Sequence, residues 1–152
     1  MILEYTRTHE NVIDPIRANP SDAGLDVFYC PANENQALAI NPSESRLAPT
    51  GLRFGVPHGY MLEVKNRSSV AAKHSLLVGA CVVDSGYDGE VFINLHNVGK
   101  APQFIKPGEK IAQLVLIPVI PFRARHNNSG DLYGDDITIS DRGDGALGST
   151  NE

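Results

Sequence analysis

The sequence predicts an all-β protein, and two observations carry that prediction. Short apolar or alternating runs recur along the chain, and Pro, Asn, Ser and Gly separate them. The 14 Gly and 10 Pro suit short strands joined by frequent turns better than they suit helices. Because the 152 residues contain no internal repeat or linker, we expect one domain.

The first half of the chain contains the first group of candidate strands. They cover 25–29 (LDVFY), 37–40 (ALAI), 47–56 (LAPTGLRFGV) and 60–67 (YMLEVKNR). In the last of these, apolar Tyr60, Leu62 and Val64 occupy every second position, which predicts one covered and one wetter face. The single helical suggestion is SSVAAKH at 68–74, where a serine would cap one or two turns.

Two further strand candidates, 75–83 and 90–97, flank the segment DSGYDG at 84–89. Its glycines permit the positive φ that a tight connection needs, so the pattern predicts a hairpin. KPGEK at 106–110 has the composition of another turn.

The run IAQLVLIPVIPF at 111–122 is apolar enough to predict a strand buried on both faces. Within it Gln113 is the only polar side chain, and it needs a hydrogen-bond partner. After Phe122 the chain becomes polar and glycine-rich, with a short strand expected at 137–139 before a mobile tail.

The charge pattern excludes some functions. The net charge of −5, without a basic run, disfavours a nucleic acid polymer as partner. Residues 1–12 have no apolar region of signal-peptide length, and Pro118 and Pro121 interrupt the longest apolar run. We therefore expect a soluble cytoplasmic protein without a membrane segment.

Metal-ligating patterns are missing from the sequence as well. Cys30 and Cys81 lack CxxC spacing and are expected to stay reduced. The 5 histidines show neither HxH nor HExxH spacing, so a zinc site is not expected.

The segment DSGYDG carries more chemistry than a turn requires. Backbone preferences account for Asp88 and Gly89, because hairpin turns favour Asp and Gly. They do not account for Asp84 and Tyr87. A carboxylate at the end of a strand, beside an aromatic ring, can orient a water molecule next to a planar or sugar-like ligand.

Three more segments are able to bind phosphates or metal ions, although each also has a plain structural explanation. Arg67, Ser68 and Ser69 suit phosphate oxygens, or form a helix cap beside a surface arginine. RGDGALGST at 142–150 has the parts to fold over a polyphosphate, or is a disordered tail. Asp26, in an apolar strand, is either a turn residue or an acidic contact for hydrated Mg²⁺.

The order of these segments is more specific than any one of them. AGLD, NRSSVAAKH, VVDSGYDGE, GEKIAQL and RGDGALGST resemble the five ordered motifs of the homotrimeric dUTPases, from about residue 22 to residue 150. The resemblance implies a distorted β-barrel or jelly-roll-like domain at 1–140, with one short helix. It also implies a flexible motif at 141–152 that closes over the active site.

The same resemblance implies an activity and an assembly. The expected reaction is Mg²⁺-dependent hydrolysis of dUTP to dUMP and pyrophosphate, by water attack at the α-phosphate. This reaction limits uracil in DNA and supplies dUMP for thymidylate synthesis. The expected assembly is a homotrimer with shared active sites.

Residue roles follow from the resemblance for the nucleoside end of the substrate. Asp84 is expected to be the general base, and Tyr87 to pack against the deoxyribose. The uracil edge would meet backbone groups of Cys81, Val82 and Val83 and of the region near Phe92.

Roles for the phosphate end follow in the same way. Arg67, Ser68 and Ser69 would contact the phosphates, and Gln113 the phosphates or the water shell of Mg²⁺. Asp26 would contact the metal through water. The tail would close over the nucleotide with Arg142, Leu147, Gly148, Ser149 and Thr150.

Five positions depart from the family pattern: Lys110 replaces the usual arginine, Asn151 ends a motif that often finishes in glycine, and three more lie where the base is expected. Leu147 stands where a phenylalanine usually stacks on uracil, Cys81 where glycine is frequent, and Phe92 is bulkier than expected beside the base. A pyrophosphatase for a modified deoxyuridine triphosphate is therefore a second candidate function.

Three different functions would use the same fold. A dCTP deaminase is disfavoured because Asn94 occupies the position of its catalytic glutamate, and an amide does not shuttle protons. A regulatory or binding protein would use the variable stretch 123–136 to meet a partner. A purely structural jelly-roll subunit would leave the combination of Asp84, Tyr87 and Gln113 without explanation.

Overall fold

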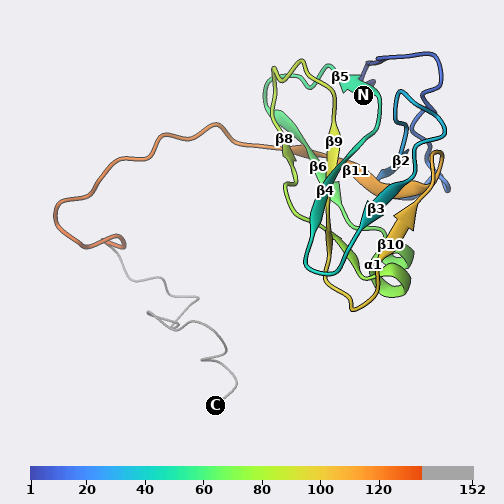
Figure 1. Cartoon of the computed structure of the whole chain (residues 1–152). Coiled ribbons are helices and arrows are strands. Elements are labelled where there is room, and N and C mark those ends of the chain that lie inside the picture. Colours follow the sequence, from blue (N-terminus) through green and yellow to red (C-terminus); the bar gives the residue numbers. More distant parts are fainter. Residues whose placement is uncertain (135–152) are drawn as a thin grey trace. The chain divides into compact units, whose positions relative to one another are not determined.

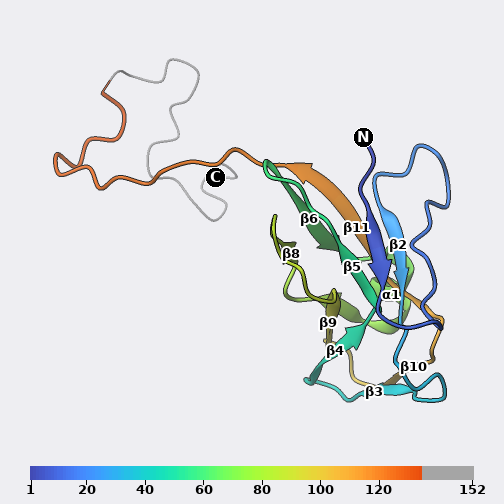
Figure 2. The same ribbon diagram turned by 90° about the horizontal axis from the view of Figure 1, so that it is seen from above.

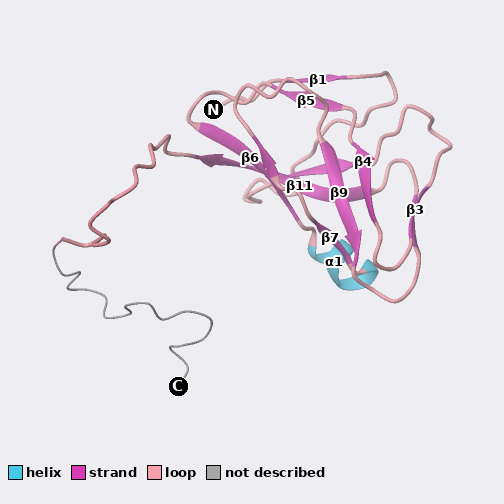
Figure 3. Ribbon diagram, turned by 60° about the vertical axis from the view of Figure 1, so that its left-hand side comes forward, coloured by secondary structure: helices cyan, strands magenta, loops and turns pink. Residues whose placement is uncertain are grey.

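The computed structural model describes residues 1–134, and residues 1–121 form one compact unit (Figure 1). The described residues form short strands and a single helix, so the all-β prediction is confirmed (Figure 3). The elements are β1 (Tyr5–Arg7), β2 (Leu25–Phe28), β3 (Leu38–Ile40), β4 (Ser45–Pro49), β5 (Leu52–Phe54), β6 (Tyr60–Lys65), α1 (Ser68–His74), β7 (Leu76–Val78), β8 (Val82–Val83), β9 (Phe92–Asn97), β10 (Gln103–Ile105) and β11 (Lys110–Pro118).

The strands form a jelly-roll-like sandwich. A 4-stranded sheet has the order β2-β11-β6-β8, and a 3-stranded sheet has the order β4-β9-β7. Figure 2 shows β6 and β11 side by side, with β9 and β4 in a separate layer. Two pairs, β1-β5 and β10-β3, complete the described sheets, and none of these closes into a barrel.

The core lies between the two larger sheets. Val27, Val64 and Leu114 contribute from the 4-stranded sheet, while Ile93 and Leu95 contribute from the 3-stranded one. The period of two predicted for β6 is confirmed, because Leu62 and Val64 are buried and their neighbours are less so. Burial of one face of each sheet is the main force that holds the sandwich together.

The expected strand at 47–56 is wrong in one respect, because the chain breaks it in two. β4 ends at Pro49, and β5 starts at Leu52. The buried Thr50 makes the break, since its hydroxyl donates to Val91 O at 2.6 Å and accepts from Leu52 N at 3.2 Å. The two halves therefore pair with different strands, β9 and β1.

The expected hairpin of 75–83 with 90–97 is also only partly correct. β7 pairs with β9, as a hairpin requires, but β8 pairs with β6 of the other sheet. The chain changes sheets between Gly79 and Cys81, because Gly79 N donates to Asn94 O at 2.8 Å and Cys81 O accepts from Val64 N at 2.7 Å. We call residues 79–81 the crossover; it opens a gap between β8 and β9.

The turn expected at 106–110 is present, with Gly108 at φ 87°. The strand that follows, β11, is shorter than expected and ends at Pro118. It is not buried on both faces along its length: Val115, Leu116 and Ile117 are only half-buried. Beyond Pro118 the chain has no described strand partner, and Ile120 is exposed.

The helix falls at the predicted residues, but its cap differs. Arg67 is the N-cap, and no side chain caps the helix, so the expected serine cap is wrong. Ser75 ends the helix in the left-handed region at φ 52°, with its N–H bonded to Ala71 O. α1 packs beside β7 (Figure 3).

A second unit begins at Phe122, and its described part extends to Gly134. Within it Asn127 organises a turn: its Nδ2 donates to Asp131 O at 2.7 Å, and its Oδ1 accepts from Ser129 N at 2.9 Å. The strand expected at 137–139, the boundary at residue 140 and the tail at 141–152 lie outside the described residues. Among those described, no helix has the length and apolar character to cross a membrane.

Candidate active site

A pocket of about 200 Å³ occupies the gap between β8 and β9. Ala80, Val82 and Val83 line one wall, and Val91 and Phe92 line the other. Asp84 and Tyr87 lie at the same pocket, so the structure brings together most of the residues expected at the nucleoside end. The pocket exists because the crossover leaves β9 before β8 begins.

The turn that follows β8 presents Asp84 and Tyr87. Tyr87 N donates to Asp84 O at 3.2 Å, which closes the turn, and the Tyr87 hydroxyl donates to Glu90 O at 2.8 Å. Among the described residues no side chain hydrogen-bonds the Asp84 carboxylate, which is exposed. An exposed carboxylate without a protein partner is able to accept a hydrogen bond from water.

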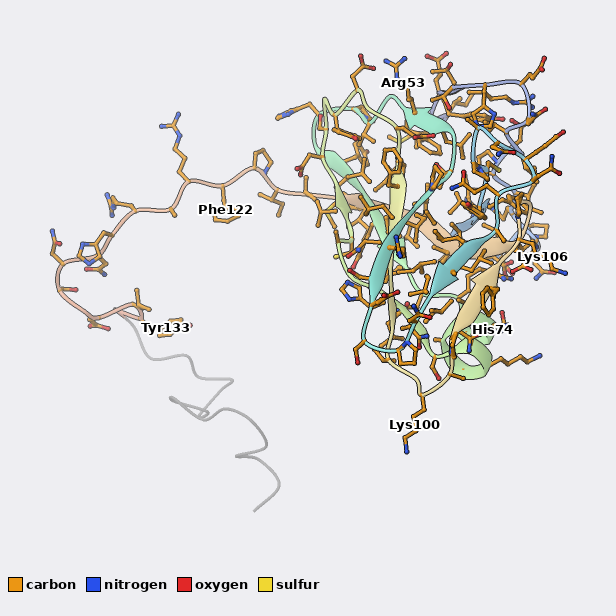
Figure 4. All side chains as sticks on the ribbon, in the orientation of Figure 1. Arg53, His74, Lys100, Lys106, Phe122 and Tyr133 are labelled. Atoms are coloured by element: carbon orange, nitrogen blue, oxygen red, sulfur yellow. The ribbon has the colours of Figure 1, made fainter. Side chains whose placement is uncertain are left out.

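Arg53 of β5 braces this turn from outside. Its Nε donates to Asp88 O at 2.7 Å, and its Nη2 contacts Asp88 Oδ1 at 2.6 Å. Figure 4 shows Arg53 at the end of the domain opposite Lys100. No sequence pattern predicts this contact, since the two residues are 35 positions apart.

Backbone groups are available to a ligand at the pocket wall. Gly79 N bonds Asn94 O, so every second residue of β9 turns its backbone groups toward the crossover side. Phe92, two residues before Asn94, therefore directs its N–H and C=O to the pocket. The Cys81 carbonyl is already bonded to Val64 N, and Cys81 packs against the core.

A second cluster lies on β2, β11 and the residues before α1. Arg67 Nε donates to Asp26 Oδ1 at 2.9 Å, and Lys110 Nζ lies 3.0 Å from Asp26 Oδ2. The Asp26 side chain is 13% exposed. Two cations around one carboxylate leave the cluster with one excess positive charge, which suits an anionic ligand.

Gln113 has the hydrogen-bond partner that the sequence predicted for it. Its Nε2 donates to Asn66 O at 2.9 Å, which ties β11 to the segment before α1. Ser68 is exposed at the start of α1, while Ser69 lines a pocket of about 220 Å³ together with Arg67 and Lys110.

The same pocket also contains a histidine that no sequence pattern marked as a site residue. His74 lies at the end of α1 (Figure 4), and its Nδ1 is 3.1 Å from Gln103 Oε1. Both residues line the pocket beside Arg67.

The two groups of candidate residues lie apart within one chain. Val83 pairs with Leu62, and Gln113 pairs with Lys65, on opposite sides of β6. Standard strand dimensions then separate Val83 and Gln113 by about 10 Å along β6 and about 10 Å across the sheet. The pocket at Asp84 and the pocket at Arg67 share no lining residue.

Comparison with known proteins identifies the family. The dUTPase family model matches residues 10–150. The chain belongs to the dUTPase family. A deoxyuridine 5'-triphosphate nucleotidohydrolase of Chlamydia trachomatis is 36% identical over 91% of this chain and 90% of its own length. The enzyme of the same name from Gloeobacter violaceus is 43% identical over 69% of this chain and 71% of its own.

Solved structures show the same fold. A dUTPase of Staphylococcus bacteriophage 80alpha, solved with dUpNHpp, superposes with a TM-score of 0.81 at 23% identity and covers 98% of both chains. A dUTPase from phage phi11 of Staphylococcus aureus, described with a structural Mg(II) ion, has a TM-score of 0.74 at 24% identity. It covers 84% of this chain and 97% of its own.

The residues of this dUTPase-family chain suit a metal ion that is bound largely through the phosphates of a nucleotide. Among the described residues no group of 3 or more His, Cys, Asp or Glu is placed to hold a metal. Mg²⁺ in proteins frequently keeps several waters and is bound through one or two carboxylates plus substrate phosphates. Asp26 supplies a carboxylate of that kind beside Arg67, and its cross-strand partner Gln113 adds an amide side chain.

Asn94 has a structural partner in this dUTPase-family chain. Its Oδ1 accepts from Ala80 N at 3.1 Å. At the position where a dCTP deaminase has its glutamate, the chain therefore has an amide that is already engaged with the crossover.

Proposed function

We propose that the chain hydrolyses dUTP to dUMP and pyrophosphate. The observation that carries the proposal is the exposed carboxylate of Asp84, which has no side-chain partner within residues 1–134, at a small pocket shared with Tyr87 and with the backbone of β9. Membership of the dUTPase family supports dUTP as the substrate, and its relatives carry the name of that activity. A net charge of −5 also favours a small nucleotide over a nucleic acid polymer. A cytoplasmic location stays a prediction.

Asp84 acts as the general base in this proposal. The oxygen of a water molecule bonds to the α-phosphorus, while one of its protons passes to the Asp84 carboxylate. The bond from the α-phosphorus to the oxygen that bridges to the β-phosphorus breaks, and that oxygen leaves with pyrophosphate. Phosphoryl transfer of this type depends mainly on positioning and charge neutralisation.

The pocket between β8 and β9 holds the nucleoside. Uracil hydrogen-bonds backbone groups that face the pocket, at Phe92 and at Val82, while Val83, whose backbone pairs with Leu62 of β6, lines the pocket wall. Tyr87 packs against the deoxyribose, held by its bond to Glu90 O, and excludes a ribose 2′-hydroxyl. Backbone recognition of a base edge needs fixed strands, and the pairing of β8 with β6 supplies that rigidity.

The cluster around Asp26 binds the phosphates. Arg67, Ser68 and Ser69 donate to phosphate oxygens, and the excess positive charge of the cluster stabilises the leaving pyrophosphate. Asp26 and Gln113 would contact Mg²⁺ through its water shell. When bound, the ion neutralises charge on the phosphate oxygens.

The separation of the two groups supports a homotrimer with shared sites, which we propose as the assembly. A site built from Asp84 of one copy and Arg67 of another would bring together the nucleoside pocket and the phosphate-binding cluster, which lie apart within one chain. We also propose that residues 141–152 close over the nucleotide, with Arg142, Leu147, Gly148, Ser149 and Thr150 in contact with it, and that residues 1–140 form the domain.

Phe92 favours a second candidate within the same reaction class. Its side chain lines the base pocket and is 43% exposed, so it is free to contact a substituent on the base. A deoxyuridine triphosphate modified at carbon 5 would place such a substituent in the pocket. The chemistry at the α-phosphate would be unchanged.

Pyrophosphate release tests the proposal. Purified protein with Mg²⁺ is offered dUTP, dCTP, dTTP, UTP and 5-substituted dUTPs, and the same reactions are run with Asp84→Asn. Hydrolysis confined to dUTP and lost in the variant supports both the reaction and the base. Faster turnover of a 5-substituted dUTP supports the second candidate, and no turnover by folded protein contradicts both.

A further inference from the structure

Asn94, in the middle of β9, holds the crossover at two points. Its backbone oxygen accepts from Gly79 N at 2.8 Å, and its side-chain oxygen accepts from Ala80 N at 3.1 Å. The next residue, Cys81, already bonds to Val64 of β6. Asn94 therefore holds the peptide N–H groups on both sides of Gly79 and sets the position at which the chain leaves β9.

The donors fix the identity of the atoms in this contact. Ala80 N–H is only a donor, so the Asn94 atom facing it must be Oδ1 and not Nδ2. His96 Nε2 lies 2.9 Å from the same Oδ1. Since Oδ1 only accepts, His96 must carry a proton on Nε2. Asn94 thus receives two hydrogen bonds on one oxygen, and His96 orients the amide that holds Ala80.

The packing at Gly79 shows how closely these groups approach. A Cβ at residue 79 would collide with Asn94 Oδ1 and His96 Nε2. A larger residue at 79 would have to displace both side chains, because the backbone passes directly against them. One residue later, Ala80 lines the pocket beside Val82 and Asp84.

We propose that Asn94 is a positioning residue for the base pocket: by holding Ala80 through its side-chain oxygen, it fixes the wall against which the base packs. The role rests on the proposed function, since it concerns the affinity of the same pocket for the nucleotide. Asn94 does not line the pocket and acts through Ala80. His96 supports it by holding the amide in the accepting orientation.

The proposal predicts an effect on KM more than on kcat. Asp84 follows Val83, whose pairing with Leu62 of β6 does not involve Asn94. Loss of the Asn94 acceptor therefore moves the base-binding wall while the catalytic carboxylate keeps its support. We expect KM for dUTP to rise roughly three- to tenfold, the range for the loss of one hydrogen bond, and kcat to change less.

Two variants of equal size separate the acceptor from the packing. Asn94→Leu keeps the shape and removes the acceptor, whereas Asn94→Asp keeps the shape and the acceptor. Asn35→Ala, at an exposed loop asparagine, is the control for asparagine removal in general. The full-length protein is assayed with dUTP for kcat and KM, and without ligand for hydrogen exchange of the Ala80 amide.

The expected result is a raised KM and faster Ala80 exchange in Asn94→Leu, with values near wild type in Asn94→Asp and Asn35→Ala. A wild-type KM in Asn94→Leu, within an active protein, would overturn the positioning role alone. Equal effects of the Leu and Asp variants would also overturn it, since the acceptor that only Asn94→Asp keeps would then make no difference. A wild-type protein that hydrolyses no nucleotide would instead overturn the proposed function, whatever the exchange shows.

Discussion

Arg67 donates from Nε to Asp26 Oδ1 across 2.9 Å and so joins the residue before α1 to the middle of β2. Lys110 Nζ reaches the other carboxylate oxygen at 3.0 Å from β11. One carboxylate thus holds three segments in place and neutralises one of two cations. The remaining positive charge is what a phosphate would meet, so the structural role and the proposed binding role depend on the same contact.

Replacing Asp26 by asparagine should destabilise the fold. The Asp26 side chain is only 13% exposed. Without its negative charge, the positive charges of Arg67 and Lys110 repel each other. We expect the free energy of unfolding to fall by about 1–3 kcal/mol, the range for charged hydrogen bonds. Urea denaturation measures it. Glu63→Gln, which removes a more exposed ion pair with Lys65, is the control and should cost less than about 1 kcal/mol. Equal stability of Asp26→Asn and wild type would contradict this role.

Asp84→Asn should separate catalysis from stability. Loss of a general base lowers kcat by about 10²–10⁴-fold. Because the carboxylate is exposed and without a side-chain partner in the described part of the chain, the free energy of unfolding should change by less than about 0.5 kcal/mol. Pyrophosphate release and urea denaturation give the two values.

Asp88→Asn is the matched control for Asp84→Asn, because it removes a carboxylate from the same turn. Its partner is Arg53, and their exposed ion pair is worth less than about 1 kcal/mol. Its effect on kcat should be much smaller than that of Asp84→Asn. Similar losses of kcat in the two variants would contradict a general base at residue 84. They would mean that catalysis depends on the total negative charge of the turn.

Local patterns predicted most elements of the fold but not all of their partners. The alternation in 60–65 and the residues of α1 were correct because side-chain period and helix propensity are local properties. The sheet change between β7 and β8 was not predictable. β8 has only 2 residues, and its partner β6 is chosen by contacts around Val64, far along the chain.

The candidate site likewise contains residues that the sequence predicted and residues that it did not. Asp84 and Tyr87 stood out because a turn does not need them, and the structure places both at one pocket. The residues that hold the pocket in shape gave no such signal. Arg53 and Asn94 act on segments 35 and 14 residues away, and only the folded chain brings these partners together.

Tyr87 should control discrimination between deoxyribose and ribose. Its hydroxyl is bonded to Glu90 O at 2.8 Å, which fixes the ring at the pocket. Tyr87→Ala removes the ring, so the ratio of kcat/KM for dUTP to that for UTP should fall by at least roughly tenfold. Tyr87→Phe keeps the ring and should retain most of the discrimination. An unchanged ratio in Tyr87→Ala would place sugar selection elsewhere.

The two cysteines should differ in reactivity. Burial raises the pKa of the Cys30 thiol, and a raised pKa lowers the fraction of reactive thiolate at neutral pH. Cys30 is also 4% exposed, whereas Cys81, the last residue of the crossover, is partly accessible. We therefore expect iodoacetamide to label Cys81 first, with Cys30 labelled only after unfolding in urea; peptide mass spectrometry measures both. Faster labelling of Cys30 in the folded protein would mean that the segment after β2 opens toward solvent and exposes the buried thiol.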